Sequence, residues 1–345
     1  MGAAAGGESR PIFIVGPSRS GTELLRSVLN RHPEIWIAHE THYFDDLRPR
    51  LRRPAEPASS EDAVRIARYF EALRRRAYGL GAPDDAPVAS VAETDPDTAF
   101  ADYCREQANA RGRRRWGEKT PRHVFRIDEI LSAFPNARIL AMARDPRAVV
   151  ASYRDWQNRW IDRKQADVGL AQALDREHTR VRRSYDLTLA TLLWRAATAV
   201  AGRAAQARPE SVRVVRFEDL LSNPEGAVRG IVDWLGVDYH GDLLDVHVVN
   251  SSYVNPAAER GFVRDMEARW RDALSAAEIA YIDALAGAVA NRLGYARSGE
   301  RLRVLFTARA LLAAPWAAGR AAMANRARIA RLGPYVLARL EALRR

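Results

Sequence analysis

Short apolar runs alternate along the chain with longer segments in which apolar residues recur every three or four positions. The short runs are rich in β-branched residues, which predicts buried strands at 11–15, 35–38, 138–143 and 212–217. Helical spacing predicts helices at 23–32, 61–77, 97–111, 227–236 and 275–293, and two or more long helices within 146–206. Apolar strands separated by helices are typical of a parallel sheet covered on both faces. The pattern therefore predicts an α/β fold with three layers, in which helices flank a parallel sheet.

The regions outside these elements indicate how the chain is organised. We expect residues 1–10 to form a flexible tail and residues 11–297 to form the main domain, with helical insertions near 48–115 and 155–210. Residues 298–345 are rich in alanine, leucine and arginine, which predicts a basic amphipathic helical extension.

The composition is that of a folded protein. With 47% hydrophobic and 28% charged residues, the 345-residue chain falls outside the disordered and collagen-like classes. Its one cysteine, Cys104, excludes an intrachain disulfide and fits a reducing compartment. The sequence has no signal-peptide pattern and no apolar stretch long enough for a membrane span. We therefore expect a cytoplasmic protein, with peripheral contact with a membrane left open.

The charge is strongly positive and is carried almost entirely by arginine. Lysine and arginine number 54 against 43 aspartate and glutamate residues, a formal net charge of +11, and only Lys119 and Lys164 are lysines. Arginine suits bidentate contacts with phosphate or sulfate. No lysine-rich tail, zinc-finger spacing or RNA-binding aromatic signature accompanies this charge, so we expect no nucleic-acid partner.

The strongest local signal is the sequence FIVGPSRSGTELLRSVL, which predicts a strand, a loop and a helix. Amide groups at the start of a helix, together with the helix dipole, attract an anion. Gly16 and Gly21 allow close backbone approach, Ser20 and Thr22 add hydroxyl groups, and Arg19 adds a charged fork. The loop therefore predicts a phosphate or sulfate site, the alternative being an ordinary strand–helix connection that binds nothing.

This loop differs from the loop of nucleoside-triphosphate kinases. Their pattern G-x-x-x-x-G-K-[ST] has a lysine after the second glycine, whereas Thr22 follows Gly21 here and the cation, Arg19, lies inside the loop. A magnesium-dependent kinase is therefore disfavoured but stays an alternative. We expect no metal ion.

The loop resembles the 5′-phosphosulfate loop of the sulfotransferases that use 3′-phosphoadenosine 5′-phosphosulfate (PAPS), enzymes related to P-loop proteins. The resemblance implies that the fold is the P-loop NTPase-like sulfotransferase fold. It also implies that PAPS is the co-substrate, bound through the loop residues Arg19, Ser20, Gly21, Thr22 and Glu23. Glu23 follows in the same loop, where the family usually has a second threonine, and we expect its side chain to point away from the anionic donor.

Residues 116–153 resemble the family's second signature, in which an arginine after a strand and a serine on the next helix hold the donor's 3′-phosphate. On this chain they are Arg144 and Ser152. The position of Arg144 at the end of an apolar strand agrees with ligand binding in parallel-sheet enzymes. The alternative is a structural ion pair between Arg144 and Asp145.

Two later blocks also match the family. In the block 212–236, we interpret Glu218 and Asp219 as structural capping residues rather than as an acid–base pair. In a later block, Arg260 resembles the family's last basic contact with the donor phosphates, and Arg264 competes for this role.

The resemblance also suggests catalytic residues. Glu40 directly precedes a threonine at the same distance from Arg19 as the glutamate base of the protein-tyrosine sulfotransferase branch, so it is the preferred general base. Small-molecule branches use a histidine, which leaves His39 and His42 as alternatives. Arg19 and Lys119 are expected to stabilise the leaving phosphate, because a compact ammonium can reach a bridging oxygen.

The expected reaction is transfer of a sulfuryl group from PAPS to a hydroxyl or amine by in-line displacement. The acceptor is expected to be a small molecule, a carbohydrate or a lipid-linked compound, held by the insertions described above. Residues 301–345 predict a contact with a membrane surface, with a second copy of the chain, or with the protein's own core. The alternatives to this activity are a nucleotide or metabolite kinase, and a non-catalytic module that binds anions or membrane surfaces.

Overall fold

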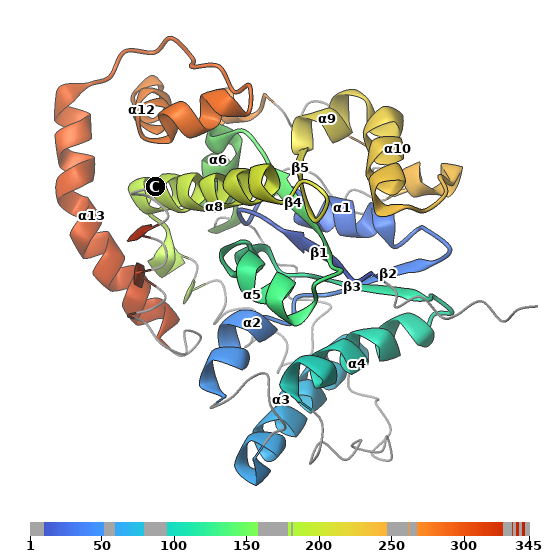
Figure 1. Cartoon of the computed structure of the whole chain (residues 1–345). Helices are drawn as coiled ribbons and strands as arrows, with labels where there is room; N and C mark the ends of the chain where they lie inside the picture. The colour runs from blue at the N-terminus through green and yellow to red at the C-terminus, as the bar shows by residue number, and fades with distance from the viewer. Residues whose placement is uncertain are drawn as a thin grey trace, which may run out of the picture.

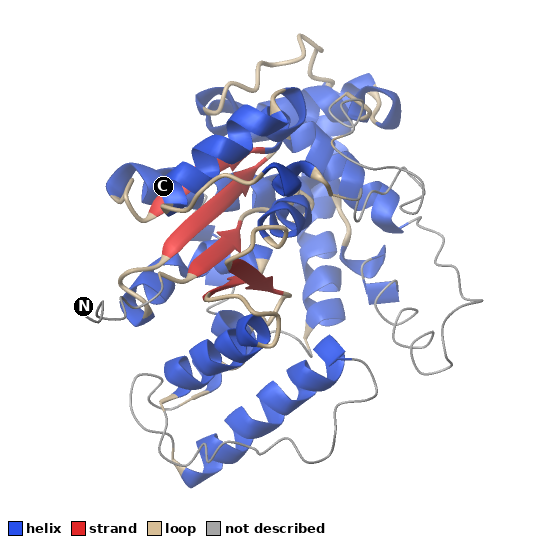
Figure 2. Cartoon of the chain, turned by 90° about the vertical axis from the view of Figure 1, so that its right-hand side faces the viewer, coloured by secondary structure: helices blue, strands red, loops and turns tan. Residues whose placement is uncertain are grey.

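The structure, a computed structural model, describes residues 10–51, 59–78, 95–157, 179–180, 182–246, 262 and 268–326, together with isolated positions beyond 326. A parallel sheet of five strands lies at the centre, in the order β2-β3-β1-β4-β5 (Figures 1 and 2). Its strands are β1 (Ile12–Val15), β2 (Ile35–Ala38), β3 (Arg115–Lys119), β4 (Arg138–Ala143) and β5 (Val212–Arg216). The predicted α/β fold with a parallel sheet is confirmed.

The sequence pattern did not predict β3. Its sequence RWGEK contains three charged residues, but Glu118 and Lys119 are both buried because β3 lies between β1 and β2. Gly117 permits this close packing, since a Cβ there would lie 2.3 Å from the carbonyl oxygen of Ile12. A strand that carries charged side chains into the interior lacks the apolar signature of its neighbours.

The residues of β1 alternate between two cores because neighbouring side chains of a strand point to opposite faces. Ile12 and Ile14 face a core that contains residues of α1 (Thr22–Leu29), α9 (Phe217–Ser222) and α10 (Pro224–Leu235). Phe13 and Val15 face the other core, to which further helices contribute. They are α2 (Tyr43–Asp46), α3 (Ser60–Tyr78), α4 (Pro96–Asn109), α5 (Ile127–Ala133) and α8 (Leu187–Ala207). This arrangement gives the three predicted layers.

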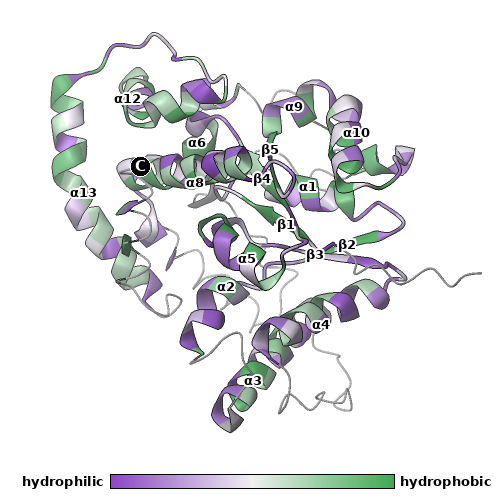
Figure 3. Ribbon diagram, in the orientation of Figure 1, coloured by the Kyte–Doolittle hydropathy of each residue, from purple (hydrophilic) through white to green (hydrophobic). Residues whose placement is uncertain are grey.

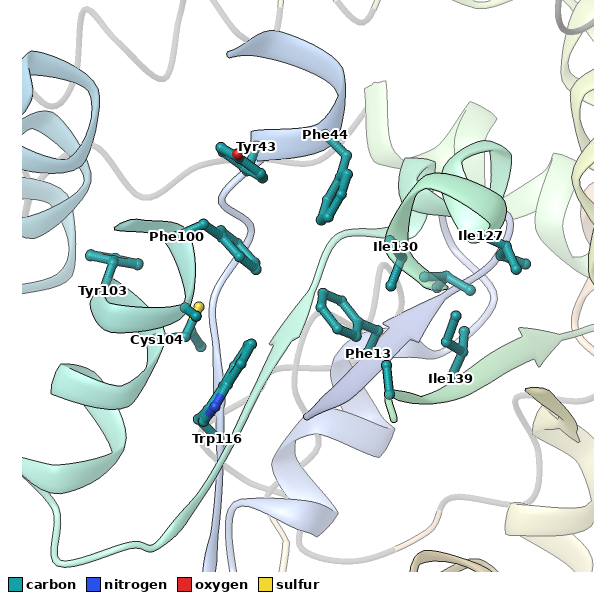
Figure 4. Close-up of a cluster of buried hydrophobic side chains, with 14 of the residues drawn as sticks. Phe13, Tyr43, Phe44, Phe100, Tyr103, Cys104, Trp116, Ile127, Ile130 and Ile139 are labelled. Carbon is teal, nitrogen blue, oxygen red and sulfur yellow. The ribbon is translucent and has the colours of Figure 1, made fainter. Parts of the chain in front are cut away.

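An aromatic cluster joins the central strand to the elements around it (Figure 4). The ring of Phe13 lies 6.1 Å from the rings of Phe100 and Trp116 and 6.2 Å from that of Phe44. These residues come from β1, α4, β3 and α2. Burial of their rings therefore packs α4 and α2 against the strands β1 and β3.

The remaining helices form an outer layer near α8. They are α6 (Pro146–Gln157), α11 (Trp270–Ala273), α12 (Ala276–Arg292) and α13 (Val304–Asn325). Short 3-10 helices are η1 (Arg48–Arg50), η3 (Pro121–Arg126) and η5 (Gly241–Leu244). The expected helical segment 146–206 includes α6 and all but the last residue of α8, whereas its residues 158–178 and 181 lie outside the described residues. None of the helices in the described ranges combines the length and apolar character that crossing a membrane requires.

The register of the sheet sets the position of the site. Ile14 of β1 pairs with Lys119 of β3, and Val15 pairs with Ala141 of β4. The loop after β1, the end of β3 and the end of β4 therefore meet at the carboxyl edge of the sheet, where parallel α/β proteins bind ligands.

Candidate active site

The loop between β1 and α1 has the backbone that its glycines predict. Gly16, Arg19 and Gly21 have positive φ angles of 138°, 70° and 93°. A Cβ at Gly16 would lie 2.4 Å from the carbonyl oxygen of Met142, and one at Gly21 would lie 2.3 Å from the ring of Phe217. Both positions therefore need glycine. Gly21 is also the N-cap of α1 and has no side chain with which to cap the first amide groups of the helix.

The side chains of this loop have different tasks. The buried hydroxyl of Ser20 donates to the carbonyl oxygen of Pro17 at 2.5 Å, so it stabilises the turn. Thr22 is the first residue of α1 and is also buried. Arg19 extends from the loop toward α6.

Arg19 and the predicted 3′-phosphate pair form one constellation. Nε of Arg19 donates to the hydroxyl of Ser152 at 3.1 Å, and Nη1 of Arg144 donates to the carbonyl oxygen of Arg19 at 3.2 Å. The two arginines thus lie beside each other although they come from different loops. The structure brings Arg19, Arg144 and Ser152 together, as both predicted donor-binding motifs require.

The position of Arg144 is fixed by several contacts. Its guanidinium carbon lies 4.3 Å from the centre of the Phe217 ring, and its carbonyl oxygen accepts a hydrogen bond from Nε1 of Trp194 at 2.9 Å. Asp145, the partner in the alternative ion pair, contacts Arg147 at 2.6 Å.

Glu218 supports the segment that carries Arg144. Its carboxylate accepts a hydrogen bond from the amide of Asp145 at 2.9 Å and another from the hydroxyl of Tyr295 at 2.8 Å. Burial raises the pKa of Glu218. The carboxylate of Asp219 has a different partner, Arg216, whose Nη1 lies 3.5 Å from Oδ1 of Asp219. The carboxylates of Glu218 and Asp219 therefore have separate partners.

Lys119 lies between two carboxylates. Its ammonium is 2.7 Å from Oε1 of Glu40 and 3.0 Å from Oε2 of Glu23, and the lysine side chain is only 3% exposed. Glu23 also contacts Arg26 at 2.6 Å. Burial raises the pKa of Glu23, but the hydrogen bond from Arg26 and the charge of Lys119 outweigh it and hold the pKa below its usual range. The Glu23 carboxylate is therefore neutralised by two cations.

Glu40, the preferred candidate for the general base, contacts Lys119 and His42. Burial raises its pKa, but the charge of Lys119 outweighs this effect, so the pKa lies below the ordinary value and Glu40 is ionised at neutral pH. Nε2 of His42 lies 3.3 Å from Oε2 of Glu40. Burial lowers the pKa of His42 to about 4, which makes His42 neutral near pH 7. His39 lies 3.9 Å from Glu23 and its side chain is 65% exposed.

Sequence reasoning missed a buried cluster beneath Glu40. Oε1 of Glu118 accepts hydrogen bonds from the amide and the hydroxyl of Thr41, both at 2.9 Å, and from the hydroxyl of Thr120. Its other oxygen lies 3.2 Å from Nδ1 of His123, and both side chains are fully buried. Glu118 thus links the residue after Glu40 to the strand that carries Lys119. The available signal was a glutamate directly before the candidate lysine.

The two arginines that compete for the last predicted contact with the donor phosphates have no described position. Arg260 and Arg264 both lie outside the described residues. Within the described ranges, no group of three or more histidine, cysteine, aspartate or glutamate side chains is placed to hold a metal ion.

Comparisons with known proteins agree with this geometry. A model of the sulfotransferase family matches residues 11–241. Nodulation protein NoeE of Sinorhizobium fredii is 24% identical over 302 residues, which are 84% of this chain and 67% of that protein. A protein-tyrosine sulfotransferase of Drosophila melanogaster is 28% identical over 146 residues, 41% of this chain and 24% of that protein. The chain therefore spans two thirds of the first relative's length and about a quarter of the second's.

Solved structures give the same fold. The sulfotransferase domain of the Synechococcus PCC 7002 olefin synthase aligns with a TM-score of 0.52 and 20% identity, covering 84% of this chain and 97% of that domain. The family model extends from β1 beyond α10 and covers more than half of the sequence. This chain belongs to the sulfotransferase family.

Proposed function

We propose that the protein transfers a sulfuryl group from PAPS to a hydroxyl or amine acceptor. The observation that carries this proposal is the contact of Arg19 with Ser152 and of Arg144 with the backbone of Arg19. A donor with phosphate groups at both ends needs cations from two loops at one place, and these contacts supply them.

The residues present suit such a donor. The loop from Gly16 to Thr22 offers Arg19 and the amide groups at the start of α1 for the 5′-phosphosulfate. Arg144 and Ser152 offer a guanidinium and a hydroxyl for the 3′-phosphate. Glu23 does not oppose this binding strongly, because Arg26 and Lys119 neutralise its charge.

In the proposed reaction an acceptor oxygen forms a bond to sulfur while the bond between sulfur and the bridging oxygen of the donor breaks. Glu40 takes the proton of the acceptor, and the nucleotide leaves as the 3′,5′-bisphosphate. Arg19 and Lys119 stabilise the negative charge that grows on the bridging oxygen. A well-placed donor to such a charge is worth about 3–4 kcal/mol of transition-state stabilisation.

Lys119 couples these two tasks. In the free protein its contact with Glu40 holds the pKa of this carboxylate low, which makes Glu40 a weak base. When the ammonium of Lys119 turns to the developing charge on the donor, its hold on Glu40 weakens and the pKa of Glu40 rises. The base therefore becomes stronger as the leaving group is stabilised.

A calorimetric titration with adenosine 3′,5′-bisphosphate, in the presence of a metal chelator, tests the donor assignment. We expect micromolar or tighter binding, and much weaker binding of adenosine 5′-monophosphate, which lacks the 3′-phosphate. Arg144→Ala should abolish the preference for the bisphosphate, whereas Arg229→Ala, at an exposed arginine of α10, should leave it unchanged. Equal affinity for the two nucleotides, or magnesium-dependent ATP turnover, would refute the proposal and favour a kinase.

A further inference from the structure

The C-terminal helix α13 has an apolar side that faces away from the protein. Its inner side packs on α8 and α12: the ring of Phe306 lies 5.8 Å from that of Tyr281, and Ala317 is buried. On the outer side, Leu305, Leu312 and Trp316 are 82%, 82% and 80% exposed. Figure 1 shows α13 at the edge of the molecule, and Figure 3 shows hydrophobic residues along much of its length.

Four of the exposed side chains of α13 form a stripe, and Val304 and Leu311 add exposed apolar surface beside it. Leu305, Leu312, Trp316 and Met323 follow one another at spacings of seven, four and seven residues, which places them on one face of a helix. Among the described residues, the large hydrophobic side chains that are exposed before residue 300 are Val64 and Leu193 alone. The concentration of apolar surface on α13 is therefore a local feature that calls for a partner.

The charge of the segment around α13 indicates the chemistry of the partner that its apolar face would bind. The segment 301–340 contains eight arginines and no aspartate or glutamate. Arg309 lies four residues after Leu305 and three before Leu312, so the guanidinium group accompanies the stripe. A second copy of the chain would place its own arginines against the arginines of this segment, which repel one another. An anionic lipid surface would instead attract these arginines.

The helix is suited to lie on a bilayer, not to cross it. Arg309 and Pro315 interrupt its apolar sequence, and its inner side is already occupied by contacts with the protein. Arg320, for example, donates to the carbonyl oxygens of Arg183 and Tyr185, each at 3.0 Å. We propose that the outer face of α13 binds the surface of membranes that contain anionic lipids, with Leu305, Leu312, Trp316 and Met323 inserted among the lipids and Arg309 beside their headgroups.

Flotation of the full chain with vesicles tests this proposal. We expect binding to vesicles of phosphatidylcholine with phosphatidylglycerol, and little binding to phosphatidylcholine alone. Leu312→Ser/Trp316→Ser keeps the net charge and removes two inserted side chains, so binding should fall at least about tenfold. Val64→Ser removes an exposed apolar residue on α3 and should bind as the wild type does.

Three outcomes would overturn the proposal: no binding of the wild type, equal binding of the double variant, or a solution dimer that the double variant dissociates. The last result would identify a second copy as the partner. Because both substituted residues are exposed, the double variant should keep the wild-type melting temperature and nucleotide affinity. This separates failure of the membrane proposal from failure of the proposed function.

Discussion

Arg19 and Ser152 are 133 residues apart in the sequence, and the guanidinium of the first donates to the hydroxyl of the second at 3.1 Å. The serine was predicted to act with Arg144 on the 3′-phosphate, whereas its hydrogen bond in the structure is made with the loop at the other end of the proposed donor. Ser152 therefore connects the two proposed phosphate sites.

Ser152→Ala should weaken binding of adenosine 3′,5′-bisphosphate by roughly tenfold or more, because a hydrogen bond to a charged group contributes about 1.5–3 kcal/mol. The loss should be smaller for adenosine 5′-monophosphate. Calorimetric titration measures both. Ser132→Ala, at an exposed serine of α5, is the matched control and should change neither affinity. An unchanged affinity of Ser152→Ala for the bisphosphate would contradict the connecting role.

Glu40→Gln should reduce sulfuryl transfer by about 10²–10⁴-fold, the contribution of a general base, while nucleotide affinity stays within a few-fold of the wild type. His42→Asn should have a much smaller effect, because burial lowers the pKa of His42 to about 4 and so makes its imidazole a weak base. The measurement is transfer from labelled PAPS to an acceptor identified by screening cell extracts. If the histidine variant lost activity and the glutamine variant did not, the base would be His42.

Lys119→Met should move the acid limb of the rate–pH profile to higher pH. The pKa of Glu40 is held low by Lys119, and transfer requires the ionised carboxylate. Activity is therefore present above this pKa and lost as pH falls through it, and removal of the ammonium raises the pKa toward and beyond that of an ordinary glutamate. The rate at the plateau should fall as well. An unmoved acid limb would show that Lys119 and Glu40 are not coupled.

Glu118→Ala should destabilise the protein by about 3–5 kcal/mol, because it breaks a fully buried pair and removes hydrogen bonds to Thr41 and Thr120. Burial raises the pKa of Glu118, but His123 outweighs it, so the folded-state pKa is lowered. Its stabilising effect is thus present above the pKa of the unfolded carboxyl, about 4.3, and is lost as pH falls through the folded value.

Urea unfolding at neutral and at acidic pH measures this effect. The difference in stability between wild type and Glu118→Gln should shrink as the pH is lowered. Glu225→Gln, which removes an exposed pair with Arg229, should cost about 1 kcal/mol or less. A similar cost for the two glutamine variants at neutral pH would show that the buried cluster contributes little.

The sequence was sufficient to predict the layers and most strands, because β1, β2, β4 and β5 contain short runs rich in apolar residues and the helices between them are amphipathic. It was not sufficient for β3, which carries two buried charges; that of Lys119 is compensated by Glu23 and Glu40, which are distant in the chain. The contact of Lys119 with Glu23 was missed for the same reason: it joins β3 to the first turn of α1. Glu23 was expected to point away from an anion, and the structure shows instead how its charge is balanced.

Glu118 and Lys119 are neighbours in β3, and their side chains leave the strand on opposite sides. The acid enters the sealed cluster with His123, while the ammonium reaches Glu40 and Glu23. A one-residue insertion or deletion in β3 would turn each side chain to the opposite side, directing the cation into the sealed cluster and a carboxylate toward the proposed donor site. This short segment should therefore tolerate changes of side chain far better than changes of length.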